Sequence, residues 1–213
     1  MSGSVVSITQ RVQTRNVPGG AGAANAAAGV AVWASRDGAL AALNPTLNIS
    51  PSGSRRGLSL SPDGTRLAVD VVGPRSVDIW VKQLPAGSFS RLTFDGSENF
   101  RPSWSADSRS VVFLSNRDGN LPSVWRQRAD GSTPAEQLLR VRAPIFEAQL
   151  SRDSRWLIYR TNDADGPNIY GLRLGQDTTP VSLVASRFNE LGAALSPDGA
   201  WLAYASDESG QLE

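Results

Sequence analysis

The amino-acid sequence predicts an all-β fold, a β-propeller of four-stranded antiparallel blades with about 45 residues per blade. Two observations support this prediction. One turn sequence recurs four times at a nearly constant spacing, and one aromatic strand position recurs four times at the same spacing. A four-stranded unit that repeats about every 40 to 50 residues is the sequence signature of a propeller, in which each sheet forms one blade around a central channel.

The recurring turn reads "SPDG" at residues 61–64 and 196–199, "SADS" at 105–108 and "SRDS" at 151–154, with its serines 44, 46 and 45 residues apart. Pro presets φ, Asp can bond the following backbone and Gly accepts positive φ, which suits a hairpin turn between the first two strands of a blade. Because the middle two copies lack Pro and Gly, we expect them to be looser. The aspartates are interpreted as structural turn residues: Asp63, Asp107, Asp153 and Asp198.

The strands follow from alternation around these turns. After the four turns come the runs "RLAVDV", "SVVFLS", "WLIYRT" and "WLAYAS", in which apolar residues recur with the period of two that is typical of a strand. The aromatic position marks the next strand of each blade, and we expect its residues to pack between blades rather than to form a stacking platform. Its members are Trp33, Trp80, Trp125 and Tyr170, which stand 47, 45 and 45 residues apart.

These strands divide the chain into a linker-like N-terminal segment and a propeller region. Residues 1–29 contain the Gly- and Ala-rich "PGGAGAANAAAG" and one strand candidate, which suggests a linker or a partial strand of a preceding blade. The propeller region, 30–213, contains a half blade at 30–43, full blades at 56–95, 100–140 and 145–185, and a half blade at 190–206.

A six-bladed ring at this period would need about 270 residues. We therefore expect an incomplete ring of six or seven blades from a longer protein, and the alternative is a small four-bladed ring closed by pairing of the two half blades. Unclosed blades would expose strand edges and apolar faces, so we also expect self-association.

Composition excludes several classes of function. Lys and Arg total 21 against 20 Asp and Glu, a net charge of +1 that gives no overall field for nucleic acid. No apolar run approaches the roughly 20 residues of a membrane span, and the N-terminus lacks the pattern of a signal peptide.

The residue types also argue against catalysis. The chain has no Cys and no His, which removes thiolate chemistry, the usual general base and the commonest zinc ligand. Paired carboxylates or a Ser and Lys pair remain open in principle, but no spacing singles out such a pair. The loops "SNRDGN" and "NDADG" hold closely spaced oxygen side chains but lack the glutamate that would complete an EF-hand, so we interpret them as turns. We predict no enzyme, no cofactor and no metal.

The candidate binding residues lie in the connections that enter the first strand of each blade, which are rich in charge. In a propeller these connections surround the mouth of the channel, where charges of both signs would suit a polar peptide, a sugar or a loop of a partner protein. The alternative is ordinary solvated charge with local ion pairs, which contribute at most about 1 kcal/mol each. The residues are Arg55, Arg56, Glu98, Asn99, Arg101, Glu147, Asn189 and Glu190.

Residues 56–73, 101–116, 146–163 and 191–206 resemble the bacterial WD-like, TolB-like propeller repeat, and "VDIWVKQL", "LTFDG" and "SNRDGN" occur in the order expected of that repeat. The resemblance implies a propeller of the kind found in TolB, in sensor regions of bacterial serine/threonine kinases and in the gating domain of prolyl oligopeptidase-like enzymes. It also implies a periplasmic or other extracytoplasmic location.

Taken with the absence of a catalytic constellation, the resemblance favours a non-catalytic binding or scaffold module that recognises a protein or ligand at the channel mouth, with a kinase sensor as one parent protein. The segment "VWASRDGALAAL" and the last 26 residues most resemble the sequences of propellers that are attached to such kinases. The alternative is the gating propeller of a serine hydrolase. Its "GxSxG" elbow does not occur in these residues.

Overall fold

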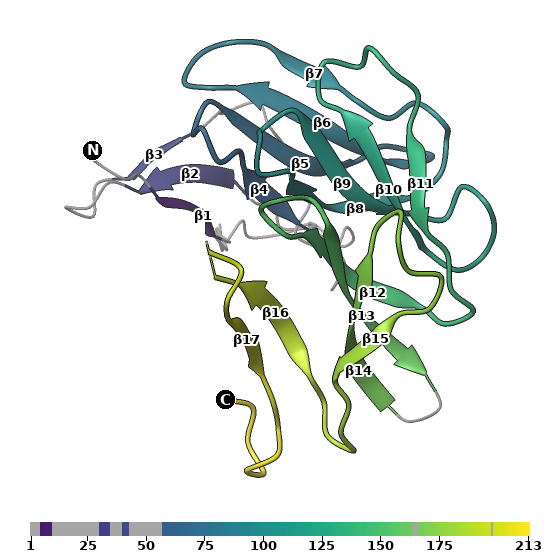
Figure 1. Cartoon of the computed structure of the whole chain (residues 1–213). Helices are drawn as coiled ribbons and strands as arrows, with labels where there is room; N and C mark the ends of the chain where they lie inside the picture. The colour runs from purple at the N-terminus through teal and green to yellow at the C-terminus, as the bar shows by residue number, and fades with distance from the viewer. Residues whose placement is uncertain (1–4, 10–29, 35–39, 43–56, 164–165, 197) are drawn as a thin grey trace, which may run out of the picture. The chain divides into compact units, whose positions relative to one another are not determined.

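The computed structural model describes residues 5–9, 30–34, 40–42, 57–163, 166–196 and 198–213 (Figure 1). The chain divides into two compact units, Met1–Arg56 and Gly57–Glu213. Every regular element in the described ranges is a β-strand, and the sheets are antiparallel, so the all-β propeller prediction is confirmed. No helix in these ranges is long and apolar enough to cross a membrane.

The first unit contains one three-stranded antiparallel sheet in the order β1-β2-β3. Its strands are β1 (Val5–Thr9), β2 (Val30–Ala34) and β3 (Leu40–Ala42). The pair β2 and β3 corresponds to the last two strands expected of the N-terminal half blade. The added strand β1 lies in the segment 1–29 and pairs along β2 with Val6 opposite Trp33.

The second unit contains three four-stranded blades and a two-stranded half blade, each in sequential strand order. The first blade comprises β4 (Leu58–Leu60), β5 (Arg66–Val72), β6 (Val77–Gln83) and β7 (Phe89–Arg91). The second comprises β8 (Asn99–Trp104), β9 (Ser110–Ser115), β10 (Ser123–Arg128) and β11 (Glu136–Leu139). The third comprises β12 (Ile145–Leu150), β13 (Trp156–Asp163), β14 (Gly166–Arg173) and β15 (Val181–Val184). The half blade comprises β16 (Leu191–Leu195) and β17 (Leu202–Ala205).

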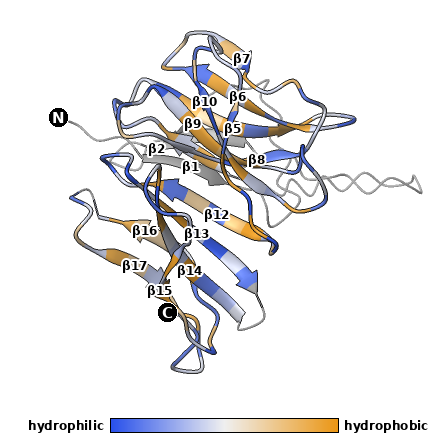
Figure 2. Ribbon diagram, turned by 45° about the vertical axis from the view of Figure 1, so that its right-hand side comes forward, coloured by the Kyte–Doolittle hydropathy of each residue, from blue (hydrophilic) through white to orange (hydrophobic). Residues whose placement is uncertain are grey.

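Apolar layers between successive blades form the core of this unit. One cluster joins the first and second blades and includes Ile79 and Phe113, and another joins the second and third blades and includes Leu114 and Tyr159. Since successive side chains of a strand point to opposite faces, β9 supplies both layers, with Val111 and Phe113 in the first cluster and Val112 and Leu114 in the second. Figure 2 shows that β16 and β17 carry apolar residues as well.

The repeated turn has the same hydrogen bonds in every described copy. In the first, the Ser61 hydroxyl donates to the Asp63 carboxylate at 2.6 Å, and the Arg66 amide donates to the Ser61 hydroxyl at 2.9 Å. Together with bonds from Thr65, this serine bond lowers the pKa of Asp63 to about 2. The serine bonds also lower the pKa of the three equivalent aspartates: Asp107, Asp153 and Asp198.

The expectation that the middle turns are looser is wrong. Gly64 adopts φ of 71°, and the serines that replace it, Ser108 and Ser154, adopt 59° and 56°. The left-handed conformation costs an L-residue about 1–2 kcal/mol, so these turns keep their geometry at the expense of backbone strain.

Candidate binding site on the first strands

Side chains connect the first strands of successive blades directly. The Trp104 indole N–H of β8 donates to the Ser59 carbonyl of β4 at 2.8 Å. The Ser103 hydroxyl donates to the Ala148 carbonyl of β12 at 3.2 Å, and the Gln149 amide donates to a carbonyl of β16 at 2.7 Å. These strands therefore form one continuous surface across the blades.

One position of this surface, four residues before the turn serine, is held by Gly57, Arg101, Glu147 and Gly192 in the four successive copies. The strand register shifts there in β8, β12 and β16, as in a β-bulge. Bulges redirect side chains and are common beside functional sites. Arg101 and Glu147 therefore lie on irregular backbone, where the regular hydrogen-bonding pattern of their strands is interrupted.

Polar contacts at this position link each blade to the next. The Asp70 carboxylate of β5 accepts hydrogen bonds from the Gly57 amide at 3.0 Å and the Arg101 amide at 3.2 Å. The Arg101 guanidinium lies 3.4 Å from the Glu147 carboxylate, whose other oxygen accepts the Gly192 amide at 3.1 Å. We call Asp70, Arg101, Glu147 and Arg160 the rim cluster.

Arg160 of β13 completes the cluster from the side of the third blade. Its guanidinium lies 3.4 Å from the same Glu147 oxygen and 4.7 Å from the centre of the Phe146 ring. The Arg160 side chain is 10% exposed, and its Nε–H has no hydrogen-bond partner among the described residues. Arg101 and Glu147 are more accessible, with 30% and 22% of their side chains exposed. A ligand could thus contact charges of both signs on one face.

Arg101 occupies a backbone conformation suited to glycine. Its φ is 52°, and Gly192 at the same position of the half blade has φ of 63°. A non-glycine residue held in this region costs about 1–3 kcal/mol, and such strain is concentrated at functional sites. Retaining an arginine here favours a role for its side chain beyond folding.

The structure places the other predicted site residues differently. Arg55 and Arg56 lie outside the described residues. Asn99 and Glu190 occupy equivalent positions in two different blades, and both are buried, with 0% and 2% exposure. Glu98 and Asn189 precede them, and their amides donate to Asn116 and Asp207 at 2.9 and 2.8 Å. Of the predicted set, the structure brings Arg101 and Glu147 into direct contact.

Asn99 belongs to a second polar group, with Asp95 and Arg117. The Arg117 guanidinium lies 2.7 Å from Asp95, donates to the Asn99 side-chain oxygen at 2.9 Å and lies over the Trp125 ring at 4.5 Å. Burial would raise the pKa of Asp95, but hydrogen bonds from Ser97 and Asn99 outweigh burial and lower it. Burial lowers the pKa of Arg117. These contacts hold in place the segment that connects the first blade to the second.

Glu190 lies in the segment that connects the third blade to the half blade. One of its carboxylate oxygens accepts hydrogen bonds from the hydroxyls of Ser186 at 2.6 Å and Ser206 at 3.4 Å.

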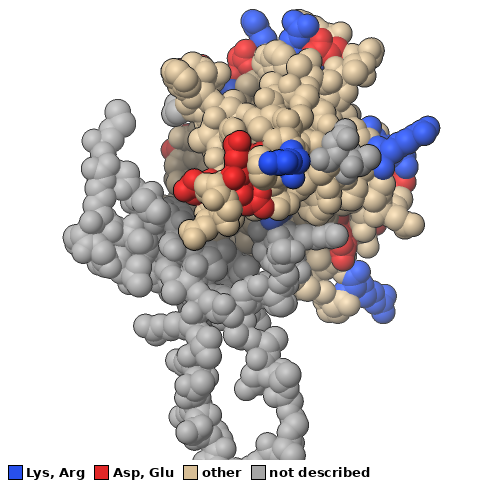
Figure 3. Space-filling model, turned by 90° about the horizontal axis from the view of Figure 1, so that it is seen from below, with Lys and Arg blue, Asp and Glu red and all other residues tan. Residues whose placement is uncertain are grey.

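Figure 3 shows basic and acidic side chains side by side on one face of the molecule. Within the described ranges, no group of three or more acidic, His or Cys side chains is arranged to hold a metal ion.

Sequence reasoning missed Asp70 and Arg160, although a signal was present. Both stand nine residues after the turn serine, where the other copies have Leu114 and Ala205. A charged residue in an otherwise apolar column of a strand, buried to 1% exposure for Asp70 and 9% for Arg160, calls for an ionic or hydrogen-bonding partner.

Comparison with known proteins decides the family. Residues 45–213 match the model of the TolB beta propeller domain. The chain belongs to this family. An uncharacterized protein of Agrobacterium fabrum is 34% identical over 73 residues, which cover 34% of this chain and 25% of that protein. The TolB-type chain thus matches a quarter of that relative's length.

Solved structures share the fold of this TolB-type propeller at low sequence identity. TolB of Acinetobacter baumannii aligns with a TM-score of 0.72 and 17% identity, covering 87% of this chain and 45% of that one. A structure assigned as TolB of Agrobacterium tumefaciens aligns with a TM-score of 0.65 and 20% identity, covering 84% and 67%. A prolyl endopeptidase aligns with a TM-score of 0.54 and 14% identity, covering 85% and 29%.

Proposed function

We propose that this TolB-type propeller is a non-catalytic recognition module that binds a protein or peptide ligand at the rim cluster. The observation that supports the proposal is the convergence of Arg101 and Arg160 on Glu147, at a bulged position where two of the four copies have glycine. Guanidinium groups recognise carboxylates and carbonyls, and a carboxylate accepts amide and ammonium donors. A polypeptide loop offers all of these groups.

The geometry suits binding because the two contacts of Glu147 with the arginines are long, at 3.4 Å each. Charge-assisted hydrogen bonds of this kind are shortest and strongest at about 2.7–2.9 Å. A ligand can therefore replace or tighten them at small cost. Arg101 is already held by its strained backbone and by the bond from its amide to Asp70 at 3.2 Å, so little ordering is required on binding.

The lack of His and Cys supports a non-catalytic role, because the usual nucleophile and base pairs cannot form. In this proposal the module lies outside the cytoplasm and forms the sensor region of a larger bacterial protein kinase. The gating propeller of a hydrolase is the second candidate, favoured by the fold shared with a prolyl endopeptidase. Reading the gene on both sides separates them, since protein-kinase motifs support the first and a Gly-x-Ser-x-Gly elbow supports the second.

The binding proposal is tested by selecting peptides from a displayed library against the wild-type chain and measuring their affinities for variants. Arg101→Gln and Glu147→Gln should each weaken the selected peptides at least about tenfold, the usual effect of losing a charge-assisted contact. Arg126→Gln and Glu136→Gln are matched controls, because that exposed ion pair of 2.6 Å lies on β10 and β11. Equal affinities for all four variants, each folded by circular dichroism, would refute the proposal.

A further inference from the structure

Arg160 is a buried charge whose hydrogen bonds are incomplete among the described residues. It is 9% exposed, and its guanidinium lies 3.4 Å from the Glu147 carboxylate. Its Nε–H is buried without a hydrogen-bond partner. Burying a guanidinium is costly unless hydrogen bonds inside the protein replace those lost from water. The rim cluster therefore contains one donor that nothing in the described part of the chain uses.

Arg117 shows how a buried arginine of this fold is satisfied when its role is structural. Its side chain is 17% exposed, and its guanidinium lies 2.7 Å from Asp95 and donates to the Asn99 oxygen at 2.9 Å. Its Nε–H donates to the Ser115 hydroxyl at 3.1 Å. Each of these three contacts is shorter than the contact of Arg160 with its carboxylate. The incomplete contacts of Arg160 are therefore a property of the rim cluster and not of buried arginines in this chain.

Glu147 does not fill the unused donor, because both of its oxygens are engaged. One oxygen is shared by Arg101 and Arg160, at 3.4 Å from each guanidinium. The other accepts the Gly192 amide at 3.1 Å. Glu147 thus holds the two guanidinium groups near each other but cannot place both oxygens on Arg160.

The unused donor has the geometry of a carboxylate site. In a guanidinium, the Nε–H and a neighbouring Nη–H point in parallel directions and together hold the two oxygens of a carboxylate. On Arg160, the Nε–H has no partner among the described residues and an Nη has the long contact with Glu147. Arg101, with 30% of its side chain exposed, adds a second positive charge. A neutral amide fits less well, because it offers one acceptor oxygen and brings a donor group of its own.

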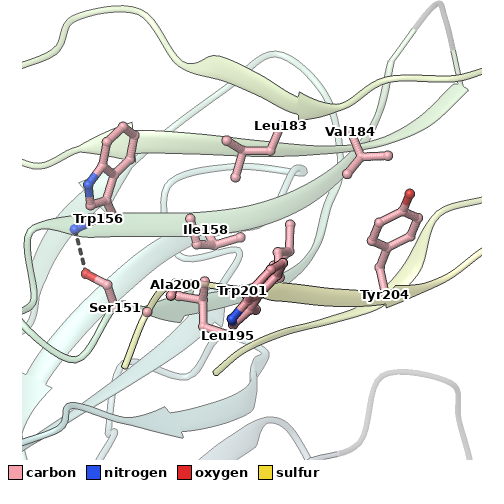
Figure 4. Close-up of a pocket in the computed structure, with 11 residues that line it drawn as sticks. Ser151, Trp156, Ile158, Leu183, Val184, Leu195, Ala200, Trp201 and Tyr204 are labelled. Carbon is pink, nitrogen blue, oxygen red and sulfur yellow. Dashed lines mark hydrogen bonds between the residues drawn. The ribbon is translucent and has the colours of Figure 1, made fainter. Parts of the chain in front are cut away.

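The neighbouring hollow on this side of β13 has different chemistry. A cavity of about 500 Å³ is lined by Ile158, two residues before Arg160, so both side chains lie on the same face of the strand. Its other described walls are apolar, aromatic or hydroxyl-bearing, and none of them is charged (Figure 4). We therefore expect a carboxylate at Arg160 and not in this hollow.

We propose that the ligand of the rim cluster carries a carboxylate, from an acidic side chain or from the C-terminal end of a polypeptide, and that Arg160 binds it through its Nε–H and Nη–H. This inference rests on the function proposed above and names the chemical group that is recognised. Arg101 adds its charge, and Glu147 keeps the two guanidinium groups in place. Because the Nε–H is covered, the half-buried Phe146 ring, which lies against this guanidinium, turns aside as the ligand enters.

The test uses three forms of one synthetic peptide taken from the library selection. The first keeps its acidic residues and has an amidated C terminus. The second has Asn and Gln in place of Asp and Glu, and the third is the second with a free C-terminal carboxylate. We expect the first or the third to bind the wild-type chain at least about tenfold more tightly than the second, as measured by calorimetry. Tighter binding of the first identifies an acidic side chain, and tighter binding of the third identifies the chain end.

Arg160→Lys keeps the positive charge but lacks the parallel donors, so the preference for a carboxylate should fall below about threefold. Arg126→Lys is the matched control, since Arg126 belongs to the exposed ion pair on β10 and β11, and it should keep the preference. In ¹⁵N NMR spectra of the wild-type chain, the Arg160 Nε–H signal should shift with the carboxylate peptide and not with the second peptide. This readout does not require a variant to fold.

Equal binding of all three peptides that still depends on Arg101 would overturn this inference and leave recognition at the rim cluster standing. Full preference for the carboxylate in Arg160→Lys, folded by circular dichroism, would also overturn it. If no peptide binds in a way that depends on Arg101, the proposed function itself is refuted, and this inference with it.

Discussion

Tyr159 and Tyr204 allow the same truncation to be made at one strand position in two blades. Tyr159 is 3% exposed, belongs to the cluster with Phe100 and Leu157, and stacks on Tyr170. Removing a large aromatic side chain from such a core costs about 3–5 kcal/mol, which includes the cavity left behind. We therefore expect Tyr159→Ala to lower the free energy of unfolding by about 4 kcal/mol.

Tyr204→Ala should cost far less. The side chain is 44% exposed, so about half of the roughly 1.5–3 kcal/mol for burying an aromatic residue applies, and no closed cavity results because the space beside it is open. We expect a loss of about 1 kcal/mol. Urea denaturation, followed by tryptophan fluorescence at low protein concentration, measures both variants. Equal losses, or a loss below about 1.5 kcal/mol for Tyr159→Ala, would refute the reasoning.

Three further predictions concern the turns and the connection between blades. Ser154→Gly should raise the free energy of unfolding by about 0.5–1 kcal/mol in urea, since Gly relieves a φ of 56°; a decrease would contradict the strain. Asp63, with its pKa lowered to about 2, stabilises the fold above about pH 4, and this is lost as pH falls towards 2. The urea midpoints of wild type and Asp63→Asn should therefore differ at pH 6 and converge near pH 2, and a constant difference would count against the turn. Arg117→Gln should cost about 2 kcal/mol in thermal or urea melts by removing its bonds to Asp95 and Asn99, and an unchanged melt would argue against this connection.

The period and turn chemistry of the sequence were enough to predict the blades, because each turn serine and aspartate acts through contacts a few residues away. The left-handed conformations of Ser108 and Ser154 were not predicted, since nothing in "SADS" or "SRDS" marks positive φ. The fold imposes it by keeping the hairpin register.

The candidate site was predictable only in part. The charged connections pointed to Arg101 and Glu147, which do meet. The same criterion selected Asn99, which the structure buries against Arg117 because charge density along the chain does not report which side chain faces the neighbouring blade. Asp70 and Arg160 enter from second strands, so their proximity to the rim depends on packing between blades.

The most direct test of the central claim is amide hydrogen exchange of the chain with and without a peptide selected from the library. Recognition at the rim cluster predicts new protection in β8 and β12, around Arg101 and Glu147, and none in the exposed pair of β10 and β11. Protection confined to the outer strands of the blades, with β8 and β12 unchanged, would contradict the account.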